Sequence, residues 1–98
     1  MELKDVIFID SFPKIDLHGL DRETARVYTN DFIRDSIKQK NEIIVIIHGI
    51  GTGLLRKTVK EELEKNKNVI EYKTFYNNNG STIARIKIWH NKKKWYNN

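Results

Sequence analysis

The chain has 98 residues, which fits one domain and leaves no room for a two-domain enzyme. Because it has no cysteine, disulfide scaffolds and thiolate metal sites are excluded, and a reducing, cytoplasmic location is favoured. No apolar run approaches the roughly 20 residues that span a bilayer, and residues 1–10 lack the pattern of a secretion signal. The composition therefore predicts one soluble domain over residues 1–98, with its core at about residues 14–89 and no membrane partner.

The net charge of +5 is concentrated near the C-terminus. The last 27 residues contain six Lys or Arg and no Asp or Glu, whereas residues 1–71 are close to neutral. A basic region of this kind is typical of a chain that binds a polyanion, because each neutralised phosphate releases condensed counterions. A tail that only improves solubility is the alternative that charge alone leaves open.

A strand and a helix are the first predicted elements. Residues 14–18 alternate between apolar and polar side chains, which predicts a strand with Asp16 and His18 on its polar face. Asp21 can cap a helix that begins at Arg22 and runs for about five turns. The apolar positions of this helix recur at three- and four-residue spacing, at Ala25, Tyr28, Phe32, Ile33 and Ile37.

The remaining elements are a buried strand, a second helix and a hairpin. Residues 43–47 are all apolar and mostly β-branched, as in a central strand that is buried on both faces beside a parallel neighbour. A second helix follows a glycine-rich turn and ends near residues 66–68, and residues 69–76 and 82–89 alternate as the two strands of a hairpin. This order predicts an α/β fold, a two-layer αβ sandwich in which a mixed four-stranded sheet carries two helices.

The glycine-rich turn is a candidate phosphate site. Gly49, Gly51 and Gly53 join the buried strand to the second helix, and Arg56 and Lys57 follow one turn later. Free amides and the positive end of a helix dipole bind anions at such a position. The turn has GxGxG rather than the dinucleotide fingerprint GxGxxG, and Arg56 stands where a Walker A loop needs glycine, so neither a dinucleotide enzyme nor an NTPase is favoured.

Two histidines form the second candidate feature. His18 and His48 each follow a predicted strand and precede a glycine, so parallel strands would bring both imidazoles to one edge of the sheet. Asp16 lies on the face of His18 and can orient its ring. Two histidines beside anion donors suit acid–base cleavage of a phosphodiester, with no cofactor required. A divalent metal held by these side chains is the alternative, since no tight ligand motif decides between the two.

The C-terminal tail, residues 90–98, is a candidate nucleic-acid contact. Lys92, Lys93 and Lys94 lie between Trp89 and the aromatic pair Trp95 and Tyr96. Lysines that pair with phosphates and aromatic rings that stack on bases are the usual means of binding a single strand. The alternative is that Trp89 belongs to the core and that the lysines form a solvated end.

Three motifs in this sequence resemble those of one known family. IDLHG at residues 15–19 resembles LDLHG, HGIGTGLLR at residues 48–56 is similar to HGxGxGxLR, and NGSTIARI at residues 79–86 resembles a segment GxGATxV. These are motifs of the small MutS-related, or Smr, domain, and they cover about residues 14–88 in the family's order. The sequence departs from the family at Asn77 and Asn78, where a pair of glycines is usual, so the hairpin could differ in shape.

The resemblance implies a fold and a function. The fold implied is an αβ sandwich like the C-terminal domain of translation initiation factor three. The family includes endonucleases that nick DNA and endoribonucleases that cut messenger RNA on stalled ribosomes. Its motifs place activity at Asp16, His18, His48, Gly49 and Gly51, with Arg56 as a phosphate contact and Thr82 as a neighbour from the third motif.

The sequence therefore predicts an Smr-type endonuclease that cleaves RNA in preference to DNA, with His18 and His48 as the acid–base pair. The phosphate and nucleic-acid contacts are expected at Gly49, Gly51, Gly53, Arg56, Lys57, Thr82, Lys92, Lys93 and Lys94. No resident metal is predicted, and magnesium or manganese enters only with the alternative, a metal-dependent DNA nickase in repair or recombination. A module that binds nucleic acid or the ribosome without cutting is the other alternative. Many Smr domains are joined to further modules, and here the tail at residues 92–94 is the candidate for recruitment.

Overall fold

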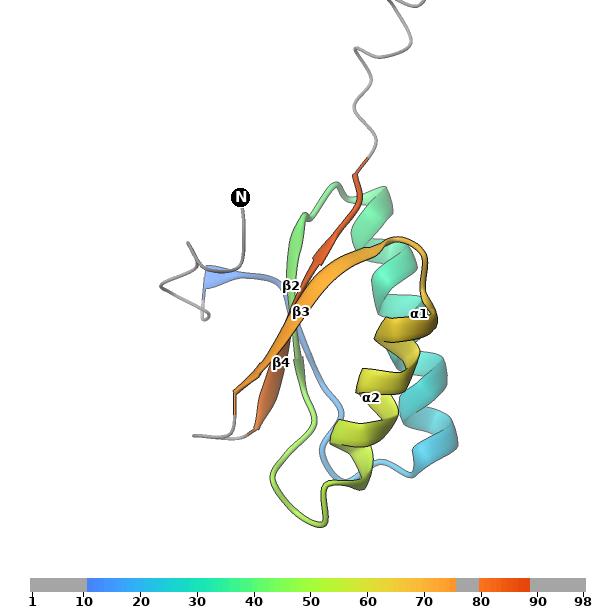
Figure 1. Cartoon of the computed structure of the whole chain (residues 1–98), viewed down its shortest axis with the longest axis vertical. Coiled ribbons are helices and arrows are strands. Elements are labelled where there is room, and N and C mark those ends of the chain that lie inside the picture. The colour runs from blue at the N-terminus through green and yellow to red at the C-terminus, as the bar shows by residue number, and fades with distance from the viewer. Residues whose placement is uncertain (1–10, 76–79, 89–98) are drawn as a thin grey trace, which may run out of the picture.

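Six elements follow one another along the chain in the predicted order (Figure 1). The structure is a computed structural model, and it describes residues 11–75 and 80–88. The elements are β1 (Lys14–Asp16), α1 (Arg22–Lys38), β2 (Ile43–Ile47), α2 (Leu54–Lys65), β3 (Val69–Phe75) and β4 (Ser81–Ile86). The first and last strands are shorter than the predicted ranges 14–18 and 82–89, and the Leu17 amide still donates to the Ile47 carbonyl at 2.7 Å beyond the end of β1.

The four strands form one mixed sheet in the order β1-β2-β4-β3. β1 and β2 are parallel, and β4 is antiparallel to both β2 and β3. Figure 1 shows α1 and α2 together on one side of this sheet, so the domain has two layers. This confirms the αβ sandwich with two helices on a mixed sheet that the sequence predicts.

The register of β1 on β2 brings their carboxyl ends to the same level. Asp16 lies opposite Ile47, so the turns that begin at His18 and His48 leave the same edge of the sheet. Parallel β1 and β2 are joined through α1, because parallel neighbours need a long crossover connection, which is usually a helix. The pairing of two parallel strands therefore fixes the place where the first two sequence motifs meet.

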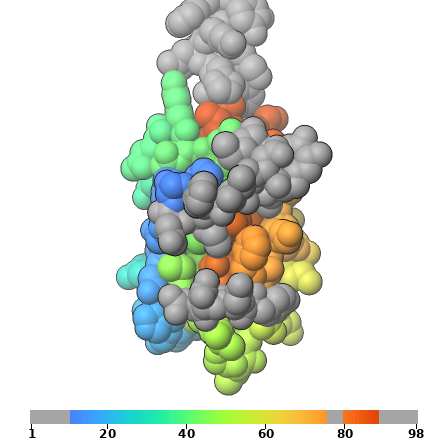
Figure 2. Space-filling model, turned by 90° about the vertical axis from the view of Figure 1, so that its left-hand side faces the viewer, coloured from blue at the N-terminus to red at the C-terminus, as the bar shows by residue number. Residues whose placement is uncertain are grey.

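β2 is the centre of the core, as its run of apolar residues predicts. Ile44 and Ile46 face the helices and pack with residues of α1, α2 and β4, among them Ile33, Leu63 and Ala84. Ile43 and Val45 point to the opposite face and are also buried, where they pack with Ile83. Figure 2 looks at this second face, with the start of the described chain in blue on one side and β3 in orange on the other.

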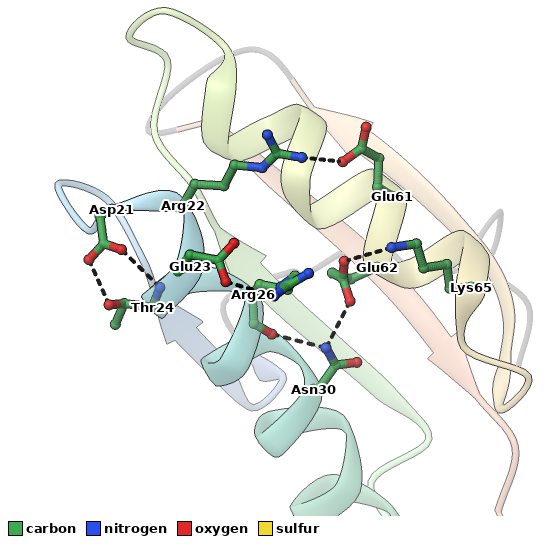
Figure 3. Close-up of polar contacts among 9 residues, drawn as sticks. All are labelled: Asp21, Arg22, Glu23, Thr24, Arg26, Asn30, Glu61, Glu62 and Lys65. Atoms are coloured by element: carbon green, nitrogen blue, oxygen red, sulfur yellow. Dashed lines mark hydrogen bonds and ion pairs between the residues drawn. The ribbon is translucent and has the colours of Figure 1, made fainter.

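Polar contacts join the two helices along the seam between them (Figure 3). Asn30 of α1 donates to the buried carboxylate of Glu62 at 2.9 Å, and Arg22 donates to Glu61 at 3.4 Å. Asp21 caps α1 as predicted, because its carboxylate accepts from the Thr24 amide at 3.1 Å. The sequence prediction was wrong at one position of the α1 stripe: Tyr28 is exposed, and the small residues Thr29 and Ser36 are buried instead. Neither described helix is long and apolar enough to cross a membrane.

Candidate active site

A cleft of about 380 Å³ lies at the carboxyl ends of β1 and β2. The turn between β1 and α1 forms one wall, with His18 to Arg22, and the loop between β2 and α2 forms the other, with His48 to Arg56. A Cβ atom built on Gly49 would lie 3.3 Å from the Cβ of His18, which shows how closely the two turns approach. The structure therefore brings together the two histidine-containing motifs that are 30 residues apart in the sequence.

Asp16 and His18 form a hydrogen-bonded pair at the mouth of this cleft. Nδ1 of His18 lies 2.7 Å from Oδ1 of Asp16, and the same oxygen accepts from the His18 amide at 3.0 Å. These bonds from the ring and the amide hold the pKa of Asp16 below its usual value, so the carboxylate is ionised at neutral pH. An ionised carboxylate accepts from an Nδ1–H, which leaves Nε2 of the neutral ring with its lone pair.

The ring of His18 is open to solvent, with 70% of its side chain exposed, and Asp16 is 52% exposed. The Nε2 lone pair is therefore available to a molecule that enters the cleft. Because the carboxylate orients the ring and fixes its tautomer, the pair has the arrangement of a general base and its positioning group. The predicted proximity of Asp16 and His18 is confirmed by these bonds, although His18 lies in the turn after β1 and not on the strand itself.

His48 has a different environment, because its side chain is buried and the residue is only 4% exposed. Nδ1 lies 3.0 Å from the Gly49 carbonyl and Nε2 lies 2.9 Å from the Thr82 hydroxyl. A carbonyl can only accept, so Nδ1 donates to it, and in the neutral ring Nε2 must accept from Thr82. Burial lowers the pKa of His48 below its usual value, and the positive charge of Arg56 acts in the same direction.

A chain of hydroxyl groups continues from His48 into the sheet. Thr82 uses its proton to reach Nε2, so its oxygen accepts the proton of Thr74, which is 3.1 Å away on β3. Both nitrogens of His48 are thus used within the fold, and Thr82 is only 1% exposed. The geometry favours a positioning role for His48 and Thr82, which differs from the sequence-based expectation that His48 exchanges protons and that Thr82 lies against nucleic acid.

The carbonyl of Gly80 ties the β2–α2 loop to the start of β4. It accepts from the amides of His48 and Gly49 at 3.0 and 3.1 Å. Gly80 has φ of +71°, and a Cβ on it would lie 2.5 Å from the Gly49 carbonyl oxygen, so only glycine fits there. The sequence prediction counted Gly49 among the amide donors to phosphate, but the structure uses that amide internally.

The amides beyond Gly49 remain as anion donors. No described residue accepts from the amides of Gly51 or Gly53, and α2 begins at Leu54 with no acidic residue in its first turn. A helix N-terminus with open amides attracts negative charge. Gly53 has φ of +85°, and a Cβ on it would lie 2.8 Å from an Arg56 guanidinium nitrogen, so glycine here makes room for that cation.

The other predicted contacts lie in different places. Arg56 lines the cleft, whereas Lys57 points into a neighbouring pocket and Thr82 lies in the core below. The lysines at positions 92–94 and the asparagines at 77 and 78 are outside the described residues. Within residues 11–75 and 80–88, no three His, Asp or Glu side chains gather as a metal would require.

Two residues of the site were not predicted from the sequence. Thr74 was not expected there at all, and Gly80 was not expected to hold the β2–α2 loop. Gly80 was expected only as part of a hairpin turn, although a lone glycine at a strand end is a signal of close backbone approach. Thr74 had no such signal, because its bond to Thr82 depends on the register of β3 on β4, in which the two residues are partners.

Comparison with known proteins gives this fold and site a family context. The family model described as the Smr domain matches residues 15–87. Endonuclease MutS2 of Staphylococcus carnosus (strain TM300) is 34% identical over 77 residues, which cover 76% of this chain and 10% of that protein. Endonuclease MutS2 of Lactococcus lactis subsp. cremoris (strain MG1363) is 32% identical over 75 residues, with the same coverage of 76% and 10%. This chain therefore spans about a tenth of the length of these curated relatives.

A solved structure agrees with the fold. The crystal structure of the Smr domain of Thermus thermophilus MutS2 matches with a TM-score of 0.72 at 23% sequence identity. The match covers 76% of this chain and 98% of that one. The similarity extends over the helices and the sheet, so the architecture found here is shared with that domain.

Proposed function

The chain belongs to the Smr domain family, and from this premise we propose that it is an endonuclease that cleaves RNA in the cleft at Asp16 and His18. The family relationship supports nucleic-acid binding or nuclease activity in general. The observation that supports the specific proposal is the pair itself: an exposed imidazole with an oriented Nε2, next to open amides at a helix N-terminus.

RNA is the proposed substrate because its cleavage needs few groups. His18 Nε2 accepts the proton of a 2′-hydroxyl, the 2′-oxygen attacks the adjacent phosphorus, and the bond from phosphorus to the 5′-oxygen breaks. The leaving 5′-oxygen takes a proton from water, and the products are a 2′,3′-cyclic phosphate and a 5′-hydroxyl. A positioned base of this kind contributes about 10²–10⁴-fold to such a reaction.

The glycine loop would hold the scissile phosphate. Charge grows on the non-bridging oxygens as the 2′-oxygen attacks, and the amides of Gly51 and Gly53 with the Arg56 guanidinium offer donors for that charge. His48 would act as a positioning residue, because its bond to the Gly49 carbonyl and the Gly80 contact set the path of this loop. The proposal thus assigns proton transfer to His18 alone.

The proposed cellular role is based on the family relationship and on the basic C-terminal segment. We propose a cytoplasmic protein that meets messenger RNA on stalled ribosomes, with residues 92–94 as the recruiting basic segment. A DNA nickase that requires magnesium or manganese is the alternative endonuclease, although the described residues offer no group of three His, Asp or Glu side chains to hold such an ion.

A module that binds nucleic acid without cutting it is the second candidate. The burial of His48 favours it, because the cleft then has one exposed imidazole instead of two. Such a module would still use the open amides and Arg56 to bind phosphate. Its affinity for nucleic acid would change little when His18 is replaced, whereas the cleavage activity of an enzyme would be lost.

The test is cleavage of end-labelled single-stranded RNA, with matched single-stranded and branched DNA, in chelator and in magnesium. We expect RNA cutting that persists in chelator, falls about 10²–10⁴-fold in His18→Ala, and is unchanged in Gln39→Ala, a control at an exposed position after α1 that lines neither the cleft nor its neighbouring pocket. Metal-dependent cutting of DNA would replace the RNA proposal with the nickase. Tight binding with no cutting of any substrate would favour the binding module.

A further inference from the structure

A second pocket, larger than the cleft, lies between α2 and β3. It encloses about 920 Å³, and three cationic side chains of α2 line it, those of Arg56, Lys57 and Lys60. Tyr72 and Thr74 of β3 form the opposite wall, and no Asp or Glu is among the lining residues. We call this pocket the α2–β3 groove. Its volume is typical of a site for a small organic ligand such as a nucleotide.

Lys57 and Lys60 are the two cations of the α2–β3 groove for which no carboxylate partner is found among the described residues. The acidic side chains of α2 are turned to other partners, with Glu61 on Arg22, Glu62 on Asn30 and Lys65, and Glu64 on the hydroxyl of Tyr72. Lys57 and Lys60 therefore give this side of the groove a positive charge, which attracts a polyanion.

The α2–β3 groove is continuous with the cleft. Arg56 lines both, together with residues 52–54 of the glycine loop. Along α2, the distance from Arg56 to Lys60 is about 6 Å, which is comparable to one nucleotide step of an extended strand. A strand whose phosphate lies at the loop amides could thus place its next phosphate against Lys57 and Lys60.

Tyr72 gives the groove a flat wall in a fixed orientation. Its ring packs against the core on one side, and its hydroxyl donates to Oε2 of Glu64 at 2.5 Å. A held aromatic ring is a platform on which any base can stack, but only where the base is unpaired. The ring beside two lysines favours a single strand over a duplex or an acidic peptide.

From these observations we propose that the α2–β3 groove binds the nucleotide next to the scissile phosphate, with Lys57 and Lys60 on its phosphate and Tyr72 against its base. The proposal rests on the proposed function for its orientation toward the cleft. It adds a substrate subsite, and it makes an unpaired nucleotide beside the cleavage point a requirement of the substrate.

The test is binding of a fluorescently labelled oligouridine to the His18→Ala chain, measured by anisotropy over a range of salt concentrations. We expect the double change Lys57→Gln and Lys60→Gln to weaken binding about tenfold and to reduce the slope of log K against log salt by about 1.4. The matched control is Lys38→Gln with Lys67→Gln, which removes the same charge from exposed positions outside the groove and should leave affinity and slope near those of the parent. Tyr72→Leu should weaken binding about fivefold, and Tyr72→Phe should not.

Three results would overturn the proposal. The control pair could weaken binding as much as the groove pair, which would make the effect one of net charge. Polyglutamate could bind as tightly as the oligouridine with the same dependence on Lys57 and Lys60, which would indicate an acidic protein segment. In the chain with intact His18, the groove variants could cut RNA with unchanged kcat/KM. That result would overturn the proposed subsite and leave the proposed endonuclease activity supported. Binding that depends on the groove, without any cutting, would instead support nucleotide binding in the groove and overturn the proposed endonuclease activity.

Discussion

Asp16 and His18 are the residues on which the proposed chemistry depends. The carboxylate accepts from both Nδ1 and the amide of His18, so it determines the ring's direction and which nitrogen has the proton. The alternation at residues 14–18 could predict that the pair lies close together, but β1 ends at Asp16, and the bond from the His18 amide to the Asp16 carboxylate is that of an Asx turn.

The tautomer of His18 should depend on the charge of Asp16. In Asp16→Asn the amide group can donate to Nδ1, which would place the proton on Nε2 and remove the base from the cleft. We expect kcat for RNA cleavage to fall about tenfold or more with KM little changed, and stability to be nearly unaffected because both side chains are largely exposed. Single-turnover and steady-state cleavage assays measure the two parameters.

Asp35→Asn, an exposed carboxylate of α1, is the control for this change. It should leave both parameters as they are in the parent chain. An Asp16→Asn chain with parental kcat would show that the carboxylate does not set the state of the base.

The role of His48 could not be predicted in the same way. Its sequence neighbourhood, a histidine after a strand and before a glycine, matches that of His18. The two differ because Thr82, 34 residues away, pairs with Ile46 in the β2–β4 register and its hydroxyl reaches Nε2 of His48. Such a contact depends on strand order and register, which local patterns do not contain.

At the scale of elements, the contact between the start of β4 and the β2–α2 loop determines the shape of the cleft. Gly80 accepts two loop amides and leaves no space for a side chain against Gly49. The element bounds near this contact were well predicted, since the apolar run gave β2 its bounds, Ile43–Ile47. The contact itself was not, because hairpin residues 77–80 were assigned from turn composition alone.

Gly80→Ala should therefore damage the cleft and the fold together. The new Cβ would meet the Gly49 carbonyl oxygen at 2.5 Å, and the residue would have to keep φ of +71°. We expect a loss of about 2 kcal/mol or more in the free energy of unfolding together with lower cleavage, as measured by urea denaturation and by the RNA assay.

Gly51→Ala is the matched change, because a Cβ on Gly51 meets nothing within 4 Å and its φ is not in the left-handed region. Its stability should stay within about 0.5 kcal/mol of the parent. Equal destabilisation by the two substitutions would contradict the contact between Gly80 and the loop.

For the whole molecule, the buried state of His48 links stability to pH. Burial lowers its folded pKa below the ordinary value of 6.5, so the unfolded chain binds the proton more tightly. The contribution to stability is therefore fully present above pH 6.5 and is lost as pH falls from there through the folded pKa. We expect Tm to decrease by a few degrees as the pH is lowered from about 7.5 to 5, a range above the titration of Asp16.

Thermal unfolding of variants tests whether the dependence of Tm on pH comes from His48. His48→Gln should flatten the dependence of Tm on pH even if the variant is less stable, whereas His18→Ala should retain it. A parental chain with constant Tm over that range, or a dependence that disappears in His18→Ala, would contradict the buried, neutral state of His48.

The arrangement of the layers was the most predictable feature of the molecule. Alternation, capping at Asp21 and the buried run at residues 43–47 together predict an order of strands and helices that suits a two-layer sandwich. The exposed Tyr28 was not predicted, because the apolar stripe of α1 is wider than the surface that α2 and the sheet cover. Small polar residues, Thr29 and Ser36, let the helix approach its neighbours more closely than an aromatic ring would.

The central claim is that His18 takes a proton from the substrate's own 2′-hydroxyl, and an RNA with a single 2′-deoxy nucleotide tests it most directly. The substitution is placed on the 5′ side of the mapped cleavage point, and the products are resolved at nucleotide level with their end groups identified. We expect the unmodified RNA to yield a 2′,3′-cyclic phosphate and the 2′-deoxy RNA to stay intact at that position. Cutting of the 2′-deoxy RNA at the same position would contradict the account, because a water molecule would then have to be the nucleophile.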